Sequence, residues 1–160
     1  MLRLRPYNKN DAKIILSWIK DERSFYMWNA GVLGAYPLTE ERFNAVAELM
    51  AFTAIDDDEI VGFFTLRRPS ESFDELRFGF VIIDPARRGE GLGKGMLSLG
   101  LVYAKQVFGA KKASLGVFEN NKPAYHCYRA VGFRESDHYE KEKYRIIGEE
   151  WNCLELELCL

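Results

Sequence analysis

Residues 87–95 read Arg-Arg-Gly-Glu-Gly-Leu-Gly-Lys-Gly, and they follow an apolar run that ends at Ile83-Asp84-Pro85. This order predicts a strand, a tight turn and the start of a helix. Glycines let the backbone turn sharply and approach a ligand closely. The first amides of a helix have no partner within the helix, so they form a binding site for anions. The stretch therefore predicts a strand–loop–helix unit that holds a phosphate-bearing ligand.

Two common phosphate-binding patterns do not fit this segment. The dinucleotide pattern G-x-G-x-x-G fails, because neither Gly89 nor Gly91 has a glycine five positions later. The Walker pattern fails as well, because Arg88 stands where that pattern requires glycine. The pattern that remains is Arg88-x-x-Gly91-x-Gly93.

A second motif lies downstream, where residues 121–133 read Asn-Lys-Pro-Ala-Tyr-His-Cys-Tyr-Arg-Ala-Val-Gly-Phe. Asn121 stands at the start of a predicted helix, where it either caps the helix or offers its amide to a ligand. Ala124 and Tyr128 are four residues apart, so they share one helix face. Gly132 is a typical helix end.

Together, Arg88-x-x-Gly91-x-Gly93 and residues 121–133 resemble the two signature motifs of the GNAT superfamily, the acyl-CoA-dependent N-acyltransferases. Cys127 departs from the second motif, in which a large apolar residue is usual. The resemblance implies that the loop amides hold the pyrophosphate of coenzyme A and that Tyr128 protonates the departing thiolate. It also implies that the strand before the loop pairs with the pantetheine arm and that Asn121 contacts the cofactor near the thioester. The residues thus assigned to the cofactor are Phe80, Val81, Ile82, Arg88, Gly89, Glu90, Gly91, Leu92, Gly93 and Asn121.

The group that removes a proton from the substrate is less sharply indicated. Glu75 is the first candidate for this base, since it lies on the predicted strand that would follow the pantetheine arm. The alternative is that Glu75 is a solvated charge at the strand edge. The ribosomal-protein alanine acetyltransferase pattern has a glutamate five residues before the asparagine, where this chain has Gly116. Glu119, His126 and a water chain remain open as routes for the proton.

The acceptor end of the site would be built by the first two helices and the closing strands. These segments carry aromatic and acidic residues, including Trp28, Tyr36, Glu142 and Tyr144. Aromatic faces and carboxylates suit a cationic amine, although packing in the core explains some of the aromatic residues equally well. The opening and closing segments resemble the RimJ/RimL-like and spermidine-acetyltransferase-like branches of the superfamily.

The fold class predicted from the periodicity is α+β, in a three-layer α/β/α arrangement with a mixed sheet of about seven strands. One domain covers residues 1–160, because neither a linker nor a repeat interrupts the pattern. The long predicted helix that ends at Phe108 would bury a face containing Met96, Leu99 and Val107. The predicted strands are residues 2–6, 51–55, 60–66, 75–83, 113–118, 140–147 and 150–160, and the predicted helices begin near residues 10, 22, 39, 91 and 122, the third reaching about Met50.

Composition excludes several classes of function. The 22 basic and 24 acidic residues give a net charge of −2, which argues against a nucleic-acid partner. The apolar run over residues 78–83 is too short to cross a bilayer. Since the first residues lack an apolar signal segment, no membrane partner and a cytoplasmic location are expected. The three cysteines form no C-x-x-C pair, so neither a structural metal nor a disulfide framework is expected.

The sequence therefore predicts an acetyl-CoA-dependent N-acetyltransferase that needs no metal. Its acceptor would be a primary amine, on a small molecule or at a protein N-terminus. The alternative is a non-catalytic acyl-CoA-binding or regulatory module on the same fold. The long alternating strand near the end of the sequence would pair with a second copy if its edge were open, which makes a homodimer a further hypothesis.

Overall fold

The computed structural model describes residues 1–47 and 50–160. Within these residues the chain forms one mixed eight-stranded sheet in the order β1-β2-β3-β4-β5-β8-β6, with β7 paired to β8. The strands are β1 (Leu2–Pro6), β2 (Met50–Asp56), β3 (Glu59–Arg67), β4 (Glu75–Ile83), β5 (Lys112–Phe118), β6 (Arg134–Glu135), β7 (Glu142–Ile146) and β8 (Glu149–Cys159). The helices are η1 (Lys9–Asp11), α1 (Ala12–Ser17), α2 (Glu22–Asn29), α3 (Glu40–Ala47), η2 (Pro85–Arg87), α4 (Leu92–Phe108) and α5 (Lys122–Val131).

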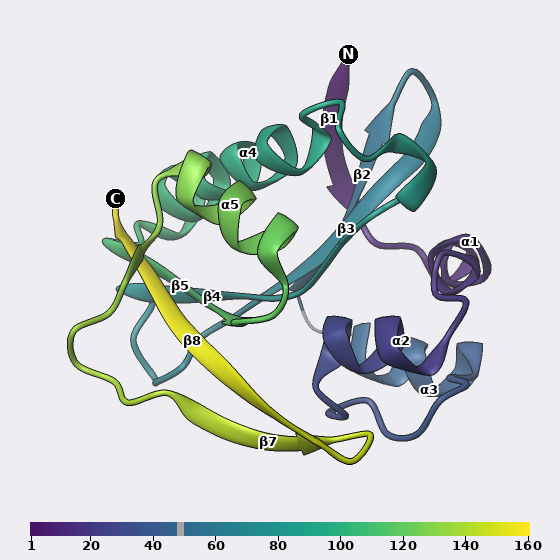
Figure 1. Ribbon diagram of the computed structural model, residues 1–160. Helices are drawn as coiled ribbons and strands as arrows, with labels where there is room; N and C mark the ends of the chain where they lie inside the picture. The colour runs from purple at the N-terminus through teal and green to yellow at the C-terminus, as the bar shows by residue number, and fades with distance from the viewer. Residues whose placement is uncertain (48–49) are drawn as a thin grey trace.

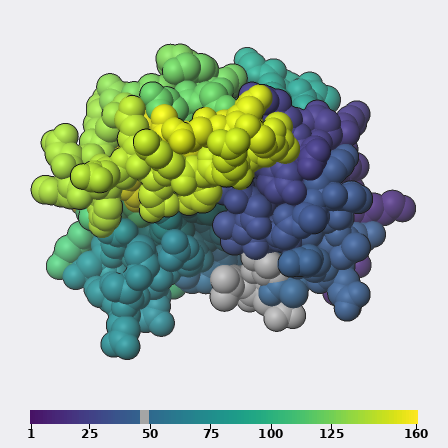
Figure 2. Space-filling view, turned by 60° about the horizontal axis from the view of Figure 1, so that its bottom comes forward, coloured from purple at the N-terminus to yellow at the C-terminus, as the bar shows by residue number. Residues whose placement is uncertain are grey.

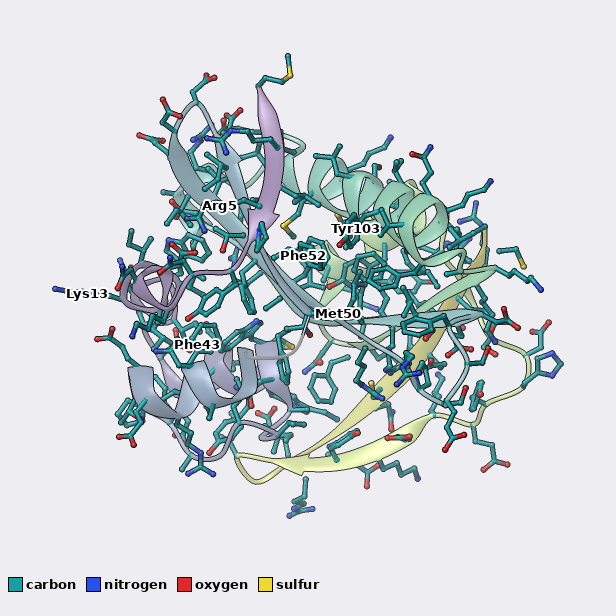
Figure 3. All side chains as sticks on the ribbon, turned by 180° about the vertical axis from the view of Figure 1, so that it is seen from behind. Arg5, Lys13, Phe43, Met50, Phe52 and Tyr103 are labelled. Carbon is teal, nitrogen blue, oxygen red and sulfur yellow. The ribbon has the colours of Figure 1, made fainter. Side chains whose placement is uncertain are left out.

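Helices cover both faces of the sheet, as the three-layer prediction requires. Figure 1 shows α4 and α5 together on one side, and α1, α2 and α3 grouped on the other. The larger apolar cluster lies under α4 and α5 and contains Phe64, Phe78 and Leu156. The second cluster lies under α1, α2 and α3, and Phe43 of α3 points into it (Figure 3). A third, smaller cluster joins α2 to β7 and β8.

The pairing of β4 with β5 is the feature that positions the site. Every other pair in the sheet is antiparallel, whereas these two strands run parallel. Their pairing covers only Glu75–Arg77 against Lys112–Ser114. Beyond this short segment the two strands separate, although both continue, to Ile83 and to Phe118. The sheet therefore opens at its centre, between two strands that each remain paired on their other side.

The structure corrects the predicted buried face of α4. Leu99 is 37% exposed and Val107 is 60% exposed, whereas Gly100 and Ala104 are buried. A Cβ at Gly100 would lie 2.8 Å from the ring of Phe78, so the helix packs directly on the aromatic core there. Met96 of the predicted face is buried together with Leu97, Gly100 and Ala104, so the contact face includes small residues that the apolar pattern weights too little.

Some predicted boundaries also change. The third helix ends at Ala47 and Met50 already belongs to β2, while residues 48 and 49 of the predicted helix lie outside the described residues. The two-residue strand β6 was not predicted, because a segment this short has no readable period. The sheet thus has eight strands where about seven were predicted.

Candidate active site

A β-bulge interrupts β4 where it separates from β5. Phe63 pairs with Ile82 and Thr65 pairs with Gly79, so two residues of β4 lie opposite the single residue Phe64 of β3. The side chains of β4 change faces of the sheet at the bulge. Residues 76 and 78 pack on the α4 side of the sheet, but beyond the bulge residues 81 and 83 take that side. The bulge therefore places Phe80 and Val81, two of the predicted cofactor residues, outside the regular ladder.

Phe80 adopts a left-handed backbone conformation, with φ of 50°. This conformation costs a residue with a side chain about 1 kcal/mol or more. The neighbouring Gly79 does not take it, and a Cβ there would lie 2.9 Å from Thr65 Oγ1. The Phe80 carbonyl accepts a hydrogen bond of 2.9 Å from the indole Nε1 of Trp28 on α2. A contact from the neighbouring layer thus accompanies the irregular backbone.

The glycine-rich loop leads from the end of β4 into α4 without a side-chain cap. Gly89 and Gly91 have φ of 85° and 78°, and there is open space where a Cβ would stand at either position. Gly91 is the N-cap of α4 and no side chain bonds to the first amides of the helix. These amides and the positive end of a 17-residue helix face the open side of the loop.

Charged side chains divide into two groups around this loop. Arg87 forms ion pairs with Glu90 at 2.8 Å, Asp56 at 2.9 Å and Glu59 at 3.0 Å. These contacts attach the loop to the hairpin between β2 and β3, and the hydrogen bond to Glu90, followed by that to Asp56, raises the pKa of Arg87. Arg88 is exposed and forms no ion pair within residues 1–47 and 50–160, so it is available to an anion.

Helix α5 carries the second motif on the same side of the sheet as α4. Asn121 is its N-cap, and its Oδ1 accepts a hydrogen bond from the Ala124 amide at 3.4 Å. Tyr128 is 8% exposed and lies in the larger cluster, which also contacts Val81 and Ile83 of β4. Burial raises the pKa of Tyr128, so its hydroxyl stays protonated at neutral pH.

The two motifs touch at Cys127 of α5. A Cβ at Gly93 would lie 3.2 Å from Cys127 Sγ, so the thiol occupies the space that the missing side chain leaves at the start of α4. Burial raises the pKa of Cys127, which keeps the thiol neutral. The unusual cysteine in the second motif thus packs against the loop of the first.

Glu75, the predicted base, lies at the paired end of β4. Its carboxylate forms an ion pair with Lys112 at 2.8 Å and accepts a hydrogen bond from Ser114 Oγ at 3.0 Å. Burial would raise the pKa of Glu75, but these two partners outweigh it and lower the pKa. The other two side chains considered as the base lie elsewhere. Glu119 forms an ion pair with Lys141 at 3.2 Å, and His126 is exposed on α5.

Sequence analysis missed a polar cluster beside the bulge. Arg77 of β4 reaches across β5 to Glu155 of β8, with which it forms two hydrogen bonds. It passes over Gly116, where a Cβ would lie 3.1 Å from Arg77 Nη2 and also 3.1 Å from Cys153 Sγ. Burial, and then the charge of Glu142, raises the pKa of Cys153 to about 11. The signal was Gly116 itself, since glycine inside a strand often marks the close approach of another group.

The predicted acceptor side corresponds to the region where α2 meets β7 and β8. Arg23 of α2 forms an ion pair with Glu149 at 3.1 Å, and Phe118, Ile146 and Trp151 pack together with residues of α2. Figure 2 shows the closing strands lying against the helices of the first third of the chain. Tyr144 donates a hydrogen bond to Glu142 at 2.7 Å, and this bond, with burial, raises the pKa of Tyr144 to about 12. Tyr144 and Glu142 therefore meet on this side, whereas Trp28 and Tyr36 pack in the second cluster, under α1, α2 and α3.

A separate hollow of about 690 Å³ contains none of the predicted site residues. It lies between β1, β2, α3 and α4, and Met50, Phe52 and Tyr103 line part of it (Figure 3). No helix in the described part of the chain is long and apolar enough to cross a membrane.

The separated central strands, the uncapped glycine loop and the helix that carries Tyr128 together define the class of GNAT-type acyltransferase folds. Residues 13–133 match the model of the acetyltransferase (GNAT) family, and the chain belongs to this family. The match confirms the resemblance that the two motifs indicated.

Relatives and solved structures agree with this class. The mycothiol acetyltransferase of Corynebacterium glutamicum (strain R) is 36% identical over 90 residues, which is 54% of this chain and 30% of that protein. The mycothiol acetyltransferase of Gordonia bronchialis is 27% identical over 140 residues, covering 82% of this chain and 43% of that protein. The chain spans less than half the length of these curated relatives.

Among solved structures, the spermidine N-acetyltransferase from Vibrio cholerae, in complex with CoA and spermine, superposes with a TM-score of 0.81. It is 19% identical and covers 99% of this chain and 95% of that chain. A putative phosphinothricin N-acetyltransferase gives a TM-score of 0.79 at 19% identity, covering 100% of this chain and 99% of that chain. At such identities the likeness establishes the fold.

Proposed function

We propose that this protein is an acetyl-CoA-dependent N-acetyltransferase, which transfers an acetyl group to a primary amine by direct attack on the thioester. The observation that carries the proposal is the opening between β4 and β5, with an uncapped glycine loop at one end and Tyr128 packed beside it. Family membership supports it independently. The whole chain, residues 1–160, would act as one catalytic domain without a metal.

The cofactor would lie along β4 and end at the loop. The amides of residues 88–93 and the Arg88 side chain would hold its pyrophosphate, because residues 88–91 are exposed and no side chain in the described part of the chain caps the start of α4. The backbone of Phe80, Val81 and Ile82 would contact the pantetheine arm at the unpaired edge of β4. Asn121 keeps its side-chain N–H groups for the ligand, since only its oxygen serves the helix cap.

The reaction combines one bond exchange with three proton movements: the nitrogen loses one proton before it attacks and a second as the amide forms, and the thiolate gains one, so one proton is released overall. The amine nitrogen forms a bond to the acetyl carbon, the carbon–sulfur bond breaks, and the thiolate leaves with its electron pair. Tyr128 would give that thiolate a proton, since burial keeps its hydroxyl protonated and places it beside β4. The ammonium must lose its proton before it attacks, which requires a base or a water chain.

We keep Glu75 as the proposed base. Its contacts with Lys112 and Ser114 suggest a structural role as the alternative, and the two roles can be distinguished by experiment. A carboxylate held by Lys112 and Ser114 has a lowered pKa, which weakens it as a base. If Glu75 accepts the proton, Glu75→Gln lowers kcat by about 100-fold and removes the acid limb of the pH–rate profile. If Glu75 only holds Lys112, the variant keeps the acid limb and loses stability instead.

The acceptor is a primary amine of a small molecule or of a protein N-terminus. The carboxylate of Glu142 and the aromatic ring of Tyr144 suit a cation. The Vibrio cholerae structure contains spermine, and the curated relatives are mycothiol acetyltransferases. A panel of polyamines, amino acids, amino sugars and short peptides therefore covers the proposed classes. A cytoplasmic location and a homodimer complete the proposal.

Calorimetric titration with acetyl-CoA, with ATP as the control ligand, tests the cofactor. We expect micromolar affinity for acetyl-CoA and none for ATP. Tyr128→Phe then tests catalysis, with an expected fall of about 100-fold in kcat and an unchanged Kd for acetyl-CoA. Tyr125→Phe is the matched control, since Tyr125 lies on the same helix and bonds to Glu135 at 2.7 Å. Binding of acetyl-CoA without acetylation of any amine would instead favour the non-catalytic module.

A further inference from the structure

The peptide between Phe80 and Val81 lies at the centre of the proposed site, and one side chain fixes its orientation. The bulge removes this peptide from the regular pairing with β3. The pairing of β4 with β5 ends at Arg77, before this peptide is reached. Trp28 supplies a partner to the Phe80 carbonyl, through the hydrogen bond of 2.9 Å from its indole. The direction of this carbonyl is therefore set by α2 and not by the sheet.

The carbonyl and the following N–H of a trans peptide point in opposite directions. Since the Phe80 carbonyl is directed toward Trp28 on the α2 side, the Val81 N–H is directed away from α2. The side chains agree with this arrangement. Phe80 packs with the cluster under α2, whereas Val81 packs with the cluster that contains Tyr128.

Trp28 is itself held firmly. Its ring lies 5.9 Å from that of Phe43, 6.1 Å from that of Phe80 and 6.5 Å from that of Phe25. Trp28 is half-buried, and contact with these three aromatic rings restricts the movement of its indole. The indole therefore acts as a fixed donor, and the left-handed backbone of Phe80 is kept in place although glycine is absent there.

We propose that Trp28 is a positioning residue for catalysis: by holding the Phe80 carbonyl, it aims the Val81 N–H at the thioester carbonyl oxygen. This inference rests on the proposed function. It links the helix on the acceptor side to the group that stabilises charge on the reacting carbonyl. A hydrogen-bond donor directed at the atom where negative charge develops accelerates acyl transfer. If the Val81 N–H loses this orientation, kcat falls and cofactor binding stays intact.

Trp28→Phe is the direct test, because phenylalanine keeps a ring against Phe43 and Phe80 but has no N–H. We expect kcat to fall about 10-fold, with the Kd for acetyl-CoA unchanged within twofold. Infrared difference spectra with acetyl-CoA carrying ¹³C at the thioester carbonyl provide the decisive signature. The band of the bound carbonyl should lie at higher frequency in the variant, because its hydrogen bond is weaker. Trp18→Phe is the matched control, since Trp18 packs in the same cluster but Phe80 receives its bond from Trp28.

If Trp28→Phe does not fold, incorporation of benzothienylalanine at position 28 removes the N–H and keeps the shape of the indole. A variant with the wild-type carbonyl band and kcat overturns the role of Trp28, while wild-type binding and turnover still support the proposed function. If the wild-type protein binds no acetyl-CoA, the proposed function itself is overturned and the inference with it. If it binds acetyl-CoA but acetylates no amine, the carbonyl band alone decides the role of Trp28.

Discussion

Helices α2 and α4 begin in opposite ways. Asp21 starts α2, and its carboxylate accepts hydrogen bonds from the Ser24 amide at 2.7 Å and from the Ser24 hydroxyl. Gly91 starts α4, and no side chain bonds to the amides that follow. The first helix satisfies its own amides with a negative group, whereas the second leaves them to a ligand. Side chains cap α2, α3 and α5, and α1 continues directly from η1, so the uncapped start of α4 indicates the position of an anion site.

The start of the first helical segment extends the comparison to a buried group. Asn8 and Asp11 form a reciprocal capping box, and Asp11 also pairs with Arg5 and accepts a hydrogen bond from Thr53. Burial would raise the pKa of Asp11, but its partners, Arg5 first, outweigh burial and lower the pKa. A closed helix start of this kind contributes stability, whereas the open start of α4 is the one we propose for cofactor binding.

Placing a carboxylate at the uncapped start of α4 should have the largest effect on cofactor affinity. Gly91→Asp places a carboxylate where the pyrophosphate would lie, so we expect the Kd for acetyl-CoA to rise about 100-fold. Calorimetric titration measures it. Gly109→Asp is the matched control, because Gly109 is also left-handed and open but lies at the other end of α4. Equal affinities of the two variants would show that the start of α4 is not the anion site.

Removing the buried carboxylate of Asp11 from the capping box of η1 should cost the most stability. Asp11→Asn leaves Arg5 without its ion pair, and we expect the free energy of unfolding at pH 7 to fall by about 2 kcal/mol. Urea titration measures it, with Arg3→Gln as the control, since the pair of Arg3 with Asp58 is exposed. A lowered folded-state pKa means that the contribution of Asp11 is present above pH of about 4 and is lost on acidification through that pKa. The two proteins should therefore converge in stability at low pH, and a constant difference would contradict this account.

Removing the charge of Arg88 beside the open start of α4 should have a smaller effect. We expect Arg88→Gln to raise the Kd for acetyl-CoA about 10-fold and to weaken its dependence on salt. Titrations at two salt concentrations test both points. Lys105→Gln removes an equal charge from the last turn of α4 and should leave the Kd unchanged. Affinity that survives the loss of Arg88 would assign the pyrophosphate to the amides alone.

Removing the exposed side-chain cap at the start of α2 should have the smallest effect. Asp21→Ala removes the cap of α2, so we expect the melting temperature to fall by a few degrees. The Kd for acetyl-CoA should not change, because α2 does not contribute amides to the loop. Differential scanning calorimetry and titration of the same samples check both expectations. A large loss of cofactor affinity would mean that α2 supports the cofactor site more directly than its cap suggests.

The backbone features of the proposed cofactor side could be predicted from the sequence because their signals are local. The loop that opens α4, the cap at Asn121 and the helix end at Gly132 are each set by one residue type at one position. The family match confirms the class that these motifs indicated. Apart from β6, the strands were predicted to within one or two residues, because each is an apolar or alternating run bounded by turn residues.

The centre of the sheet could not be predicted in this way. Glycine is the usual residue for a left-handed backbone, yet here Phe80 adopts it beside Gly79. The carbonyl of Phe80 in this bulge accepts a hydrogen bond from Trp28, a partner 52 residues away in the chain. The bond between Arg77 and Glu155 likewise joins strands that are far apart in sequence, and only the absence of a side chain at Gly116 hints at it. Features that require two distant partners leave no periodic signal in either segment.

The position of β8 has a consequence for biosynthesis. This strand pairs with β5, β6 and β7, and its residues are the last of the sheet to be translated. Until residues 149–159 have left the ribosome, β5 has no neighbour on its outer edge, and Leu154 and Leu156 are missing from the core. An open strand edge over an unfinished core is a template for association with other chains. The nascent protein therefore depends most on chaperones during synthesis of the segment that precedes β8.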